Sequence, residues 1–214
     1  MTIVITGASR GIGAALAALY KDAGEEVIGT ARGAGAEAAL DVTDPASHAT
    51  FATQLKDRPL DLLICNAGGY LDKGDDLETG FGADLWAQSF ATNVTGVFLT
   101  VQALLPNLRA ASGAKIAIIA SQMGSSTRAP GGSYIYRASK AAAINLGRNL
   151  AVDLKPEGIA VGIYHPGWVR TDMGGDQGEI SVAESAQGLA QRIAALVLAQ
   201  TGAFETWDGR PHPF

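Results

Sequence analysis

The sequence predicts an α/β fold in which a doubly wound parallel sheet is flanked by helices. Short apolar runs rich in Val and Ile alternate along the chain with longer segments whose apolar residues recur at helical spacing. A glycine-rich turn stands between the first apolar run and the first helical segment. No internal repeat, low-complexity tract or linker interrupts the pattern. We therefore expect residues 1–214 to form a single domain of the Rossmann type.

Each strand and helix is predicted from its own pattern. The strands are apolar runs, as in sheets covered on both faces: 2–5, 26–30, 39–42, 60–65, 115–120, 159–164 and 203–206. Helices are predicted from residue 12 to Gly24, after the N-cap signal Thr43-Asp44-Pro45, and over 84–108, 134–154 and 182–198. The segments 70–82 and 121–132 are predicted as loops. In such sheets, ligands gather at the carboxyl ends of the strands.

Composition narrows the possible functions and locations. The net charge of -5, from 16 Lys and Arg against 21 Asp and Glu, argues against a nucleic-acid partner. Cys65 is the only cysteine, so no intrachain disulfide can form and a reducing compartment fits. No apolar run approaches the roughly 18 residues that a membrane span needs, and a first strand at Thr2 leaves no room for a signal peptide. We expect a cytoplasmic protein with no membrane partner.

The glycine-rich turn reads Thr6-Gly7-Ala8-Ser9-Arg10-Gly11-Ile12-Gly13. Gly7 is suited to positive φ, Gly11 to close approach of a pyrophosphate, and Gly13 to close packing of helix on strand. The following helix would offer free N–H groups and the positive end of its dipole to phosphates. A purely structural turn is the alternative, because the spacing is G-x-x-x-G-x-G rather than the commoner G-x-G-x-x-G.

Tyr136 and Lys140 form a candidate proton-transfer pair. They are four residues apart on a predicted helix, so both side chains lie on one face. A nearby ammonium favours the phenolate and would move the tyrosine pKa from about 10 towards working pH. The alternative is a surface lysine beside a packed tyrosine. Tyr134 competes for the role, but its i+4 partner is Ala138, which supplies no cation.

Two further polar residues are candidates for the same site. Ser121 follows a buried strand, where its hydroxyl could hydrogen-bond a substrate carbonyl and the oxyanion that develops from it. Serine is also an ordinary strand-ending residue. Asn93 interrupts an apolar helix, where an amide is unfavourable unless its hydrogen bonds are made. Asn93 is therefore predicted to have a functional or helix-bending role.

The ordered set of motifs resembles the short-chain dehydrogenase/reductase family. The set comprises the turn 6–13, Asn66-Ala67-Gly68, Asn93, Ser121, Tyr136-x-x-Ser139-Lys140 and Pro166-Gly167-x-x-x-Thr171. It covers essentially the whole chain. The run 165–173 and the ending Phe204…Trp207-Asp208-Gly209 are similar to the C-factor and carbonyl-reductase-like branch. The resemblance implies hydride transfer between a nicotinamide cofactor and a carbonyl or alcohol, by a homodimer or homotetramer paired through helices 84–108 and 134–154.

The resemblance also implies a role for each matched residue. Tyr136 would be the general acid in carbonyl reduction, Lys140 would lower its pKa and hold the nicotinamide ribose, Ser121 would position the substrate oxygen, and Asn93 would anchor a relay water. The other implied cofactor contacts are Gly7, Ser9, Arg10, Gly11, Ile12 and Gly13 on the pyrophosphate side, Asp41 and Val42 at the adenine, Asn66, Ala67 and Gly68 at its ribose, and Pro166, Gly167, Val169 and Thr171 at the carboxamide.

The residues after the second strand indicate NADP(H) rather than NAD(H). An acidic residue there usually binds the ribose hydroxyls of NAD and would repel the 2′-phosphate of NADP. This chain has Ala31 and then Arg32, whose guanidinium is suited to a phosphate. Arg10 would reach the same phosphate from the first loop. The alternative is that both arginines are solvated surface residues.

Two other functions are compatible with parts of the sequence. One is a nicotinamide-sensing regulatory protein with little turnover. The complete set Asn93, Ser121, Tyr136 and Lys140 argues against it, because a sensor need not retain a proton relay. An epimerase or dehydratase would need a C-terminal substrate domain, and only about 40 residues follow Met173. His165 has no second ligand at metal-binding spacing, so it is predicted to be structural and no metal is expected. Arg170 and Asp172 are predicted as a solvated loop pair.

Overall fold

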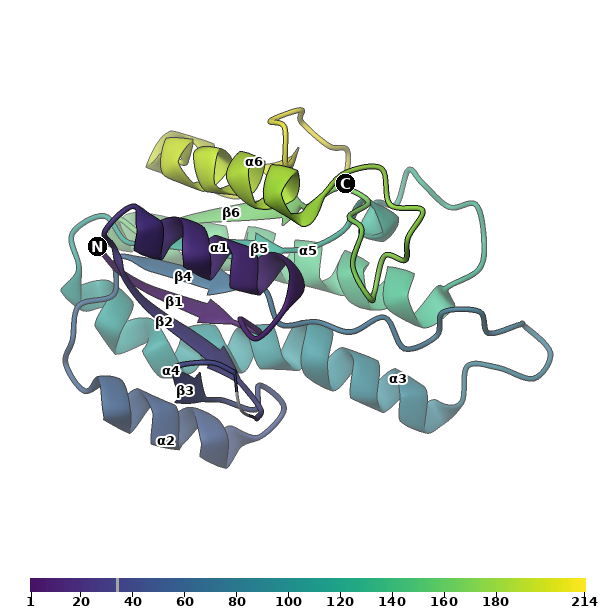
Figure 1. Ribbon diagram of the computed structural model, residues 1–214, viewed down its shortest axis with the longest axis horizontal. Helices are drawn as coiled ribbons and strands as arrows, with labels where there is room; N and C mark the ends of the chain where they lie inside the picture. The colour runs from purple at the N-terminus through teal and green to yellow at the C-terminus, as the bar shows by residue number, and fades with distance from the viewer. Residues whose placement is uncertain (34) are drawn as a thin grey trace.

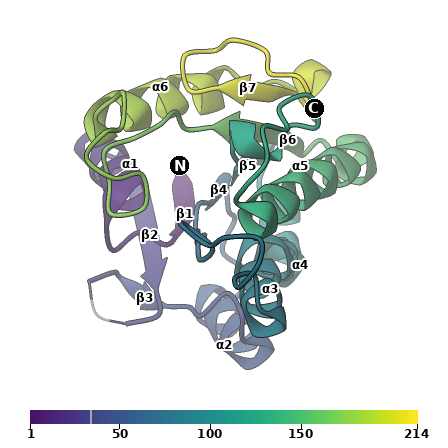
Figure 2. The same cartoon turned by 90° about the vertical axis from the view of Figure 1, so that its right-hand side faces the viewer.

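A seven-stranded parallel sheet forms the centre of the protein, and helices cover both of its faces (Figures 1 and 2). The computed structural model describes residues 1–33 and 35–214. Its strands are β1 (Thr2–Thr6), β2 (Glu26–Ala31), β3 (Ala38–Ala39), β4 (Leu62–Cys65), β5 (Lys115–Ile119), β6 (Ala160–His165) and β7 (Phe204–Thr206). They lie in the order β3-β2-β1-β4-β5-β6-β7, and neighbouring strands are parallel. The predicted fold class is confirmed.

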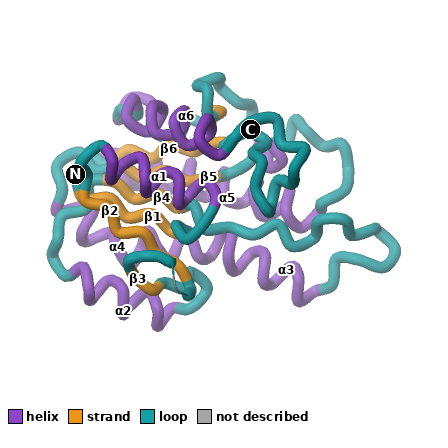
Figure 3. The backbone as a smooth tube through the Cα atoms, viewed as in Figure 1, coloured by secondary structure: helices purple, strands orange, loops and turns teal. Residues whose placement is uncertain are grey.

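The helices form a layer on each side of the sheet, and they alternate with the strands along the chain (Figure 3). One layer consists of α1 (Gly11–Asp22) and α6 (Val182–Ala195). The other consists of α2 (Pro45–Leu55), α4 (Gly96–Ala110) and α5 (Tyr134–Leu154). The shorter α3 (Ala83–Phe90) runs beyond the edge of the sheet, roughly in line with α4 (Figure 1).

Strand side chains fill a separate core on each side of the sheet. In β1, Ile3 and Ile5 pack with Leu16 of α1 and Leu189 of α6, whereas Val4 between them belongs to the core under the opposite layer. All five of these side chains are completely buried, and each stabilises the fold by about 1.5–3 kcal/mol. Burial on both faces explains why the strands are apolar without alternation.

The structure corrects four of the predicted segments. The predicted helix 84–108 is divided by a π-helical turn, Ala91–Thr95, between α3 and α4. The predicted strand 39–42 is only β3, because the Asp41 carboxylate accepts the Thr43 N–H and hydroxyl and turns the chain. The last helix ends at Ala195, and Leu198–Gln200 is a 3-10 turn. A 3-10 turn, Gln122–Gly124, also lies within the predicted loop 121–132.

The order of the strands fixes where a ligand site can form. The connections run outward through β2 and β3 on one side of β1, and through β4 to β7 on the other. The direction therefore reverses between β1 and β4, and the loops after these two strands diverge. Thr6 ends β1 and Gly7 follows it at this reversal, and Asn66 follows β4. Both predicted glycine motifs thus lie at the reversal.

Candidate active site

The turn between β1 and α1 has the positive φ angles expected of its glycines. Gly7 and Gly11 have φ values of +68° and +56°, which a side chain would disfavour. A Cβ on Gly13 would lie 2.2 Å from the Gly7 carbonyl oxygen, so only glycine lets the helix start this close to the turn. The Asn66 amide donates to the carbonyl oxygens of Thr6 and Gly7, each at 3.0 Å, and ties the end of β4 to this turn.

The N-terminus of α1 fits the phosphates of a dinucleotide. No side chain of the described residues caps this helix, and its first turn carries no acid. Its first backbone N–H groups can therefore meet an anion. Thr171 lies next to this turn, because its methyl carbon would be 3.7 Å from a Cβ on Gly11. The glycine turn and the segment after β6, far apart in sequence, thus lie side by side.

Arg10 and Arg32, the two arginines predicted to reach the cofactor phosphate, are both exposed. Arg10 forms an ion pair with Asp172, with 2.5 Å between Nη1 and Oδ2. The expected pairing of Arg170 with Asp172 is therefore wrong; Arg170 donates instead to the Gly178 carbonyl oxygen. Arg32 is exposed beside the end of β2, and its charge lowers the pKa of Asp41, although the larger causes are the hydrogen bonds from Thr43.

The remaining predicted cofactor residues differ in their surroundings and in their exposure. Gly68 lies beside the catalytic candidates: a Cβ there would be 3.2 Å from Asn93 Oδ1 and 3.4 Å from Lys140 Nζ. Ala67 lies against Gly7, with 2.9 Å between its Cα and a Cβ placed on that glycine. Val42 is buried, whereas Ser9 is exposed and Ile12 partly exposed.

Tyr136 lies near the start of α5 and is only 8 % exposed. Burial raises the pKa of Tyr136 to about 12; Tyr70 and Asp72 act in the same direction, and a hydrogen bond with Ser121 opposes them. Lys140 Nζ is 5.8 Å from the centroid of the Tyr136 ring. The expected lowering of the tyrosine pKa is therefore not met in the chain alone, because burial is the largest influence on this pKa.

Lys140 is itself buried, and burial lowers its pKa to about 8. Its ammonium donates to the Ile119 carbonyl oxygen at the end of β5, at 3.0 Å. Ser121 follows β5, and its hydroxyl oxygen accepts the Met123 N–H at 3.1 Å. Ser121, Tyr136 and Lys140 thus meet at the carboxyl end of β5.

The side chain of Asn93 connects three segments. Its amide nitrogen donates to the Gly69 carbonyl oxygen at 2.8 Å and to Ser139 Oγ at 3.0 Å, while its oxygen accepts the Gly69 N–H at 2.8 Å. The π-helical turn presents this buried amide to the loop after β4 and to α5. The hydrogen bonds explain the amide in an apolar helix, and π turns are frequent at functional sites. A relay water at Asn93 stays a prediction.

Two residues beside Tyr136 were missed from the sequence. The Tyr70 ring stacks on the Tyr136 ring, with 4.3 Å between centroids and 21° between planes. The Asp72 carboxylate, 1 % exposed, accepts the backbone N–H groups of Ile135 and Tyr136. Both stand in the segment 70–82, whose polar composition predicted only a loop. No sequence signal pairs an acid in such a loop with a helix that begins more than 60 residues later, so the contact arises from the fold.

The segment after β6 is short and folds back on itself. Gly167 has a φ of +90°, and Val169 pairs with Ile180 in an isolated parallel bridge. The Ser185 hydroxyl donates to the Pro166 carbonyl oxygen at 2.6 Å, which fixes the segment to α6. Lys73 donates to the Met173 carbonyl oxygen at 3.2 Å from the loop after β4. Residues 174–180 form turns rather than a helical substrate cover.

His165, the last residue of β6, was predicted to be structural. It is buried, and its Nδ1 has no hydrogen-bond partner among the described residues. Burial lowers its pKa to about 4, and nearby His212 adds to the effect. Within the described part of the chain, no group of three His, Cys, Asp or Glu side chains is arranged to hold a metal ion.

His165 is expected to make the protein less stable in mild acid. The unfolded histidine titrates near 6.5 and the folded one near 4, so only the unfolded state gains a proton between these values. The contribution of His165 to the free energy of unfolding is complete above pH 6.5. It falls by about 3 kcal/mol as pH drops to 4. Urea denaturation of the chain and of His165→Asn across this range measures the effect; equal slopes against pH would contradict it.

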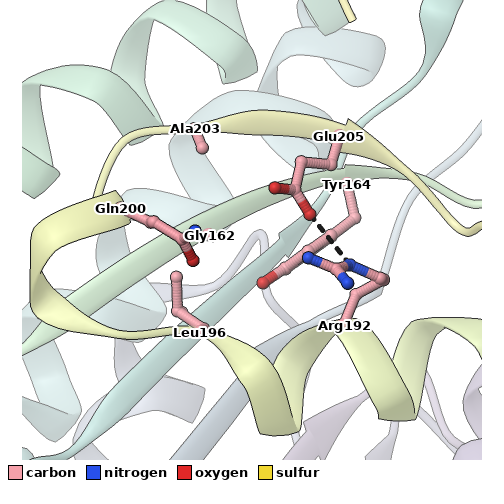
Figure 4. A pocket seen from close by; sticks show the side chains of 7 residues that line it. All are labelled: Gly162, Tyr164, Arg192, Leu196, Gln200, Ala203 and Glu205. Carbon is pink, nitrogen blue, oxygen red and sulfur yellow. Dashed lines mark hydrogen bonds and ion pairs between the residues drawn. The ribbon is translucent and has the colours of Figure 1, made fainter. Parts of the chain in front are cut away.

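A separate small cavity lies between α6, β6 and β7 (Figure 4). Its volume is about 10 Å³, and its lining includes the ion pair of Arg192 and Glu205, 3.0 Å apart. It contains none of the candidate site residues. Among the described residues, the helices include none that is both long and apolar enough to cross a membrane.

The site and the fold together define a class of protein. The family model described as short chain dehydrogenase matches residues 1–180. The chain therefore belongs to the short-chain dehydrogenase/reductase family of oxidoreductases, as its motifs predicted.

Individual relatives agree with this assignment. The chain is 36% identical over 167 residues to the C-signal of Myxococcus xanthus, covering 77% of this chain and 98% of that protein. It is 33% identical over 225 residues to 1-hydroxy-2-glutathionyl-2-methyl-3-butene dehydrogenase of Rhodococcus sp. strain AD45, covering 97% of each. The structure of NADPH-bound carbonyl reductase from chicken fatty liver superimposes with a TM-score of 0.90 at 30% identity, covering 100% of this chain and 98% of that one.

Proposed function

We propose that this protein is an NADPH-dependent carbonyl reductase in which Tyr136 gives the proton. The observation that carries the proposal is that Ser121, Tyr136 and Lys140 meet at the end of β5, where Gly68 of the second glycine motif lies beside Lys140. The likeness to an NADPH-bound carbonyl reductase supports the same direction and cofactor.

Each residue has a task that follows from its position. The nicotinamide supplies the hydride when it is bound. The Ser121 hydroxyl holds the substrate oxygen, and the buried Tyr136 hydroxyl stays protonated near neutral pH and can give its proton to that oxygen. Lys140, with a pKa of about 8, would hydrogen-bond the nicotinamide ribose and assist proton loss from the tyrosine.

Consumption of NADPH with a panel of aldehydes, ketones and diketones tests this function. The short turns of 174–180 cannot cover much apolar surface, so we expect several substrates to react, with weak binding of small ones. Absence of turnover with every member of the panel, together with tight cofactor binding, would favour the alternative of a nicotinamide-sensing protein. Activity confined to one substrate at a micromolar KM would contradict the broad pocket.

NADPH is expected to be preferred clearly over NADH. Ala31 ends β2 without a negative charge, and exposed Arg32 follows it. The acid that comes next, Glu37, is bound to Lys21 and to the Gly29 N–H at 2.8 Å. A charge-assisted hydrogen bond contributes about 1.5–3 kcal/mol, or about ten- to a hundredfold in affinity.

The double substitution Ala31→Asp and Arg32→Ala is expected to reverse this preference, measured as the ratio of kcat/KM for the two cofactors. Arg58→Ala is the matched control, because Arg58 lies beyond the other end of β2, paired with Glu26 at 3.1 Å. Equal kcat/KM for both cofactors in the unmodified protein would refute the prediction.

The proposal also covers the domain organisation, the oligomeric state and the cellular location of the protein. We propose that residues 1–214 act as one dinucleotide-binding oxidoreductase domain in a cytoplasmic homodimer or homotetramer. The single Cys65, which is buried and unpaired, is compatible with a reducing compartment. Phe98 of α4 and Val152 of α5, 40% and 71% exposed, lie on the helix pair through which the subunits would associate.

A further inference from the structure

A buried carboxylate that was not among the predicted site residues contacts the backbone of Tyr136. Asp72 is 1 % exposed and lies in the loop between β4 and α3. Its Oδ2 accepts the Ile135 N–H at 2.9 Å and the Tyr136 N–H at 3.3 Å, while its Oδ1 lies 3.2 Å from the same Tyr136 nitrogen. A buried charge is retained only where its hydrogen bonds are made. Here, all of them go to the first turn of α5.

The start of α5 depends on this distant residue. The residue before the helix, Ser133, has a left-handed backbone with φ of +48°, and its side chain does not cap the helix. Its hydroxyl is hydrogen-bonded to Tyr70 OH instead. The N–H groups that a local cap would satisfy are therefore left to Asp72, whose negative charge is also favourable at a helix N-terminus.

The loop that carries Asp72 is fixed to the rest of the site at two other points. Gly69 exchanges two hydrogen bonds with Asn93, and Asn93 donates to Ser139 on α5. Tyr70 lies flat against the Tyr136 ring. One short segment, 69–72, thus holds Tyr136 in two ways: Tyr70 packs on the face of its ring, and Asp72 binds its backbone N–H.

We propose that Asp72 is the positioning residue of the proton donor: its buried carboxylate holds the first turn of α5 in place and sets a negative charge beside Tyr136. This inference rests on the proposed function for the identity of the proton donor. The groups that face Tyr136 are Tyr70 and Asp72 from the loop, Lys140 from α5 and the hydroxyl of Ser121 after β5. Burial is the main cause of the raised pKa of Tyr136, and Tyr70 and the Asp72 charge act in the same direction.

The substitution Asp72→Asn removes the negative charge at the start of α5 but keeps the side-chain cap of the helix. Asparagine keeps an acceptor oxygen for the backbone amides and caps helices about as well as aspartate. For carbonyl reduction, we expect the high-pH limb of the kcat/KM profile, where Tyr136 loses its proton, to move to lower pH. Asp72→Ala removes the cap as well and is expected to lower Tm by roughly 3–8 °C. A residue that only supports the fold would lower activity at all pH values without moving the limb.

The matched control is Asp76→Asn. Asp76 also accepts two backbone N–H groups, from Glu78 and Thr79 at 2.9 Å each, but it is exposed and serves its own turn. The same change in charge there is expected to leave the limb in place. An unmoved limb in Asp72→Asn, or equal movement in both variants, would overturn the proposal.

A second readout does not depend on turnover. A fluorinated tyrosine, whose phenol is more acidic than that of tyrosine, replaces Tyr136, and fluorine NMR follows its ionisation in the chain without cofactor. We expect the midpoint to move to lower pH in Asp72→Asn and to stay unchanged in Asp76→Asn. An unchanged midpoint in Asp72→Asn refutes the effect of the charge. If the midpoint moves but no carbonyl is reduced by the wild-type chain, the proposed function fails and the electrostatic inference stands.

Discussion

Replacing Tyr136 with phenylalanine is expected to lower kcat for carbonyl reduction by about 10²–10⁴-fold. The substitution removes one hydroxyl and retains the ring that stacks on Tyr70 at 4.3 Å, so the loop and the start of α5 are expected to keep their structure. Cofactor affinity is expected to change little, because the glycine turn and Lys140 remain. The measurement is single-turnover and steady-state kinetics, with cofactor binding followed separately by fluorescence.

Tyr134→Phe is the matched control for this prediction. Tyr134 stands two residues earlier on the same helix, is 40 % exposed and meets the Phe81 ring edge-on at 5.1 Å between centroids. Its hydroxyl has no lysine at i+4, and its loss is expected to leave kcat near normal. The reverse result, with Tyr134→Phe inactive and Tyr136→Phe active, would show that the tyrosine was assigned wrongly.

Replacing Gly13 with alanine is expected to lower the free energy of unfolding by about 3 kcal/mol and Tm by roughly 6–12 °C. The added Cβ would lie 2.2 Å from the Gly7 carbonyl oxygen and 2.5 Å from Asn66 Nδ2, and the first of these atoms belongs to the backbone. The start of α1 has to move away from the turn, so NADPH affinity is expected to fall at least tenfold. Thermal unfolding and cofactor titration measure the two effects.

Gly82→Ala provides the comparison for Gly13→Ala. Gly82 precedes α3 with φ of −54°, and a Cβ there meets nothing within 4 Å. The same chemical change at this position is expected to alter the free energy of unfolding by no more than about 0.5 kcal/mol. If both variants lose the same stability, then the loss does not come from crowding at the turn.

The fold was predictable because its signals are local. Runs such as 2–5 and 115–120 are apolar and β-branched, and the start and end of α5 coincide with the predicted 134–154. The division of the helix at Asn93 was foreseen only as an irregularity, since a π turn depends on partners such as Gly69 that the helix sequence does not contain. The third strand was predicted too long because its apolar residues continue past the turn that Asp41 makes.

Residues of the candidate site were predictable where the whole sequence pattern lies within one short segment, as in the turn 6–13 or the spacing of Tyr136 and Lys140. Asp72 and Tyr70 were not predictable, since their function depends on a helix that starts more than 60 residues later. The pKa of Tyr136 was predicted in the wrong direction for the chain alone. Spacing places a lysine beside the tyrosine, but it contains no measure of how deeply both groups are buried.

The hydrogen bonds from Asn66 to the turn after β1 have a consequence for motion. A turn that is already held in one shape loses little conformational entropy when an anion binds to it. The turn therefore has its binding shape before any anion arrives. The neighbouring segment 168–178 is joined to the turn and to the loop after β4 by exposed contacts, Arg10 with Asp172 and Lys73 with Met173. Exposed pairs of this kind contribute little to stability, so we expect the turn to be the more rigid of the two segments.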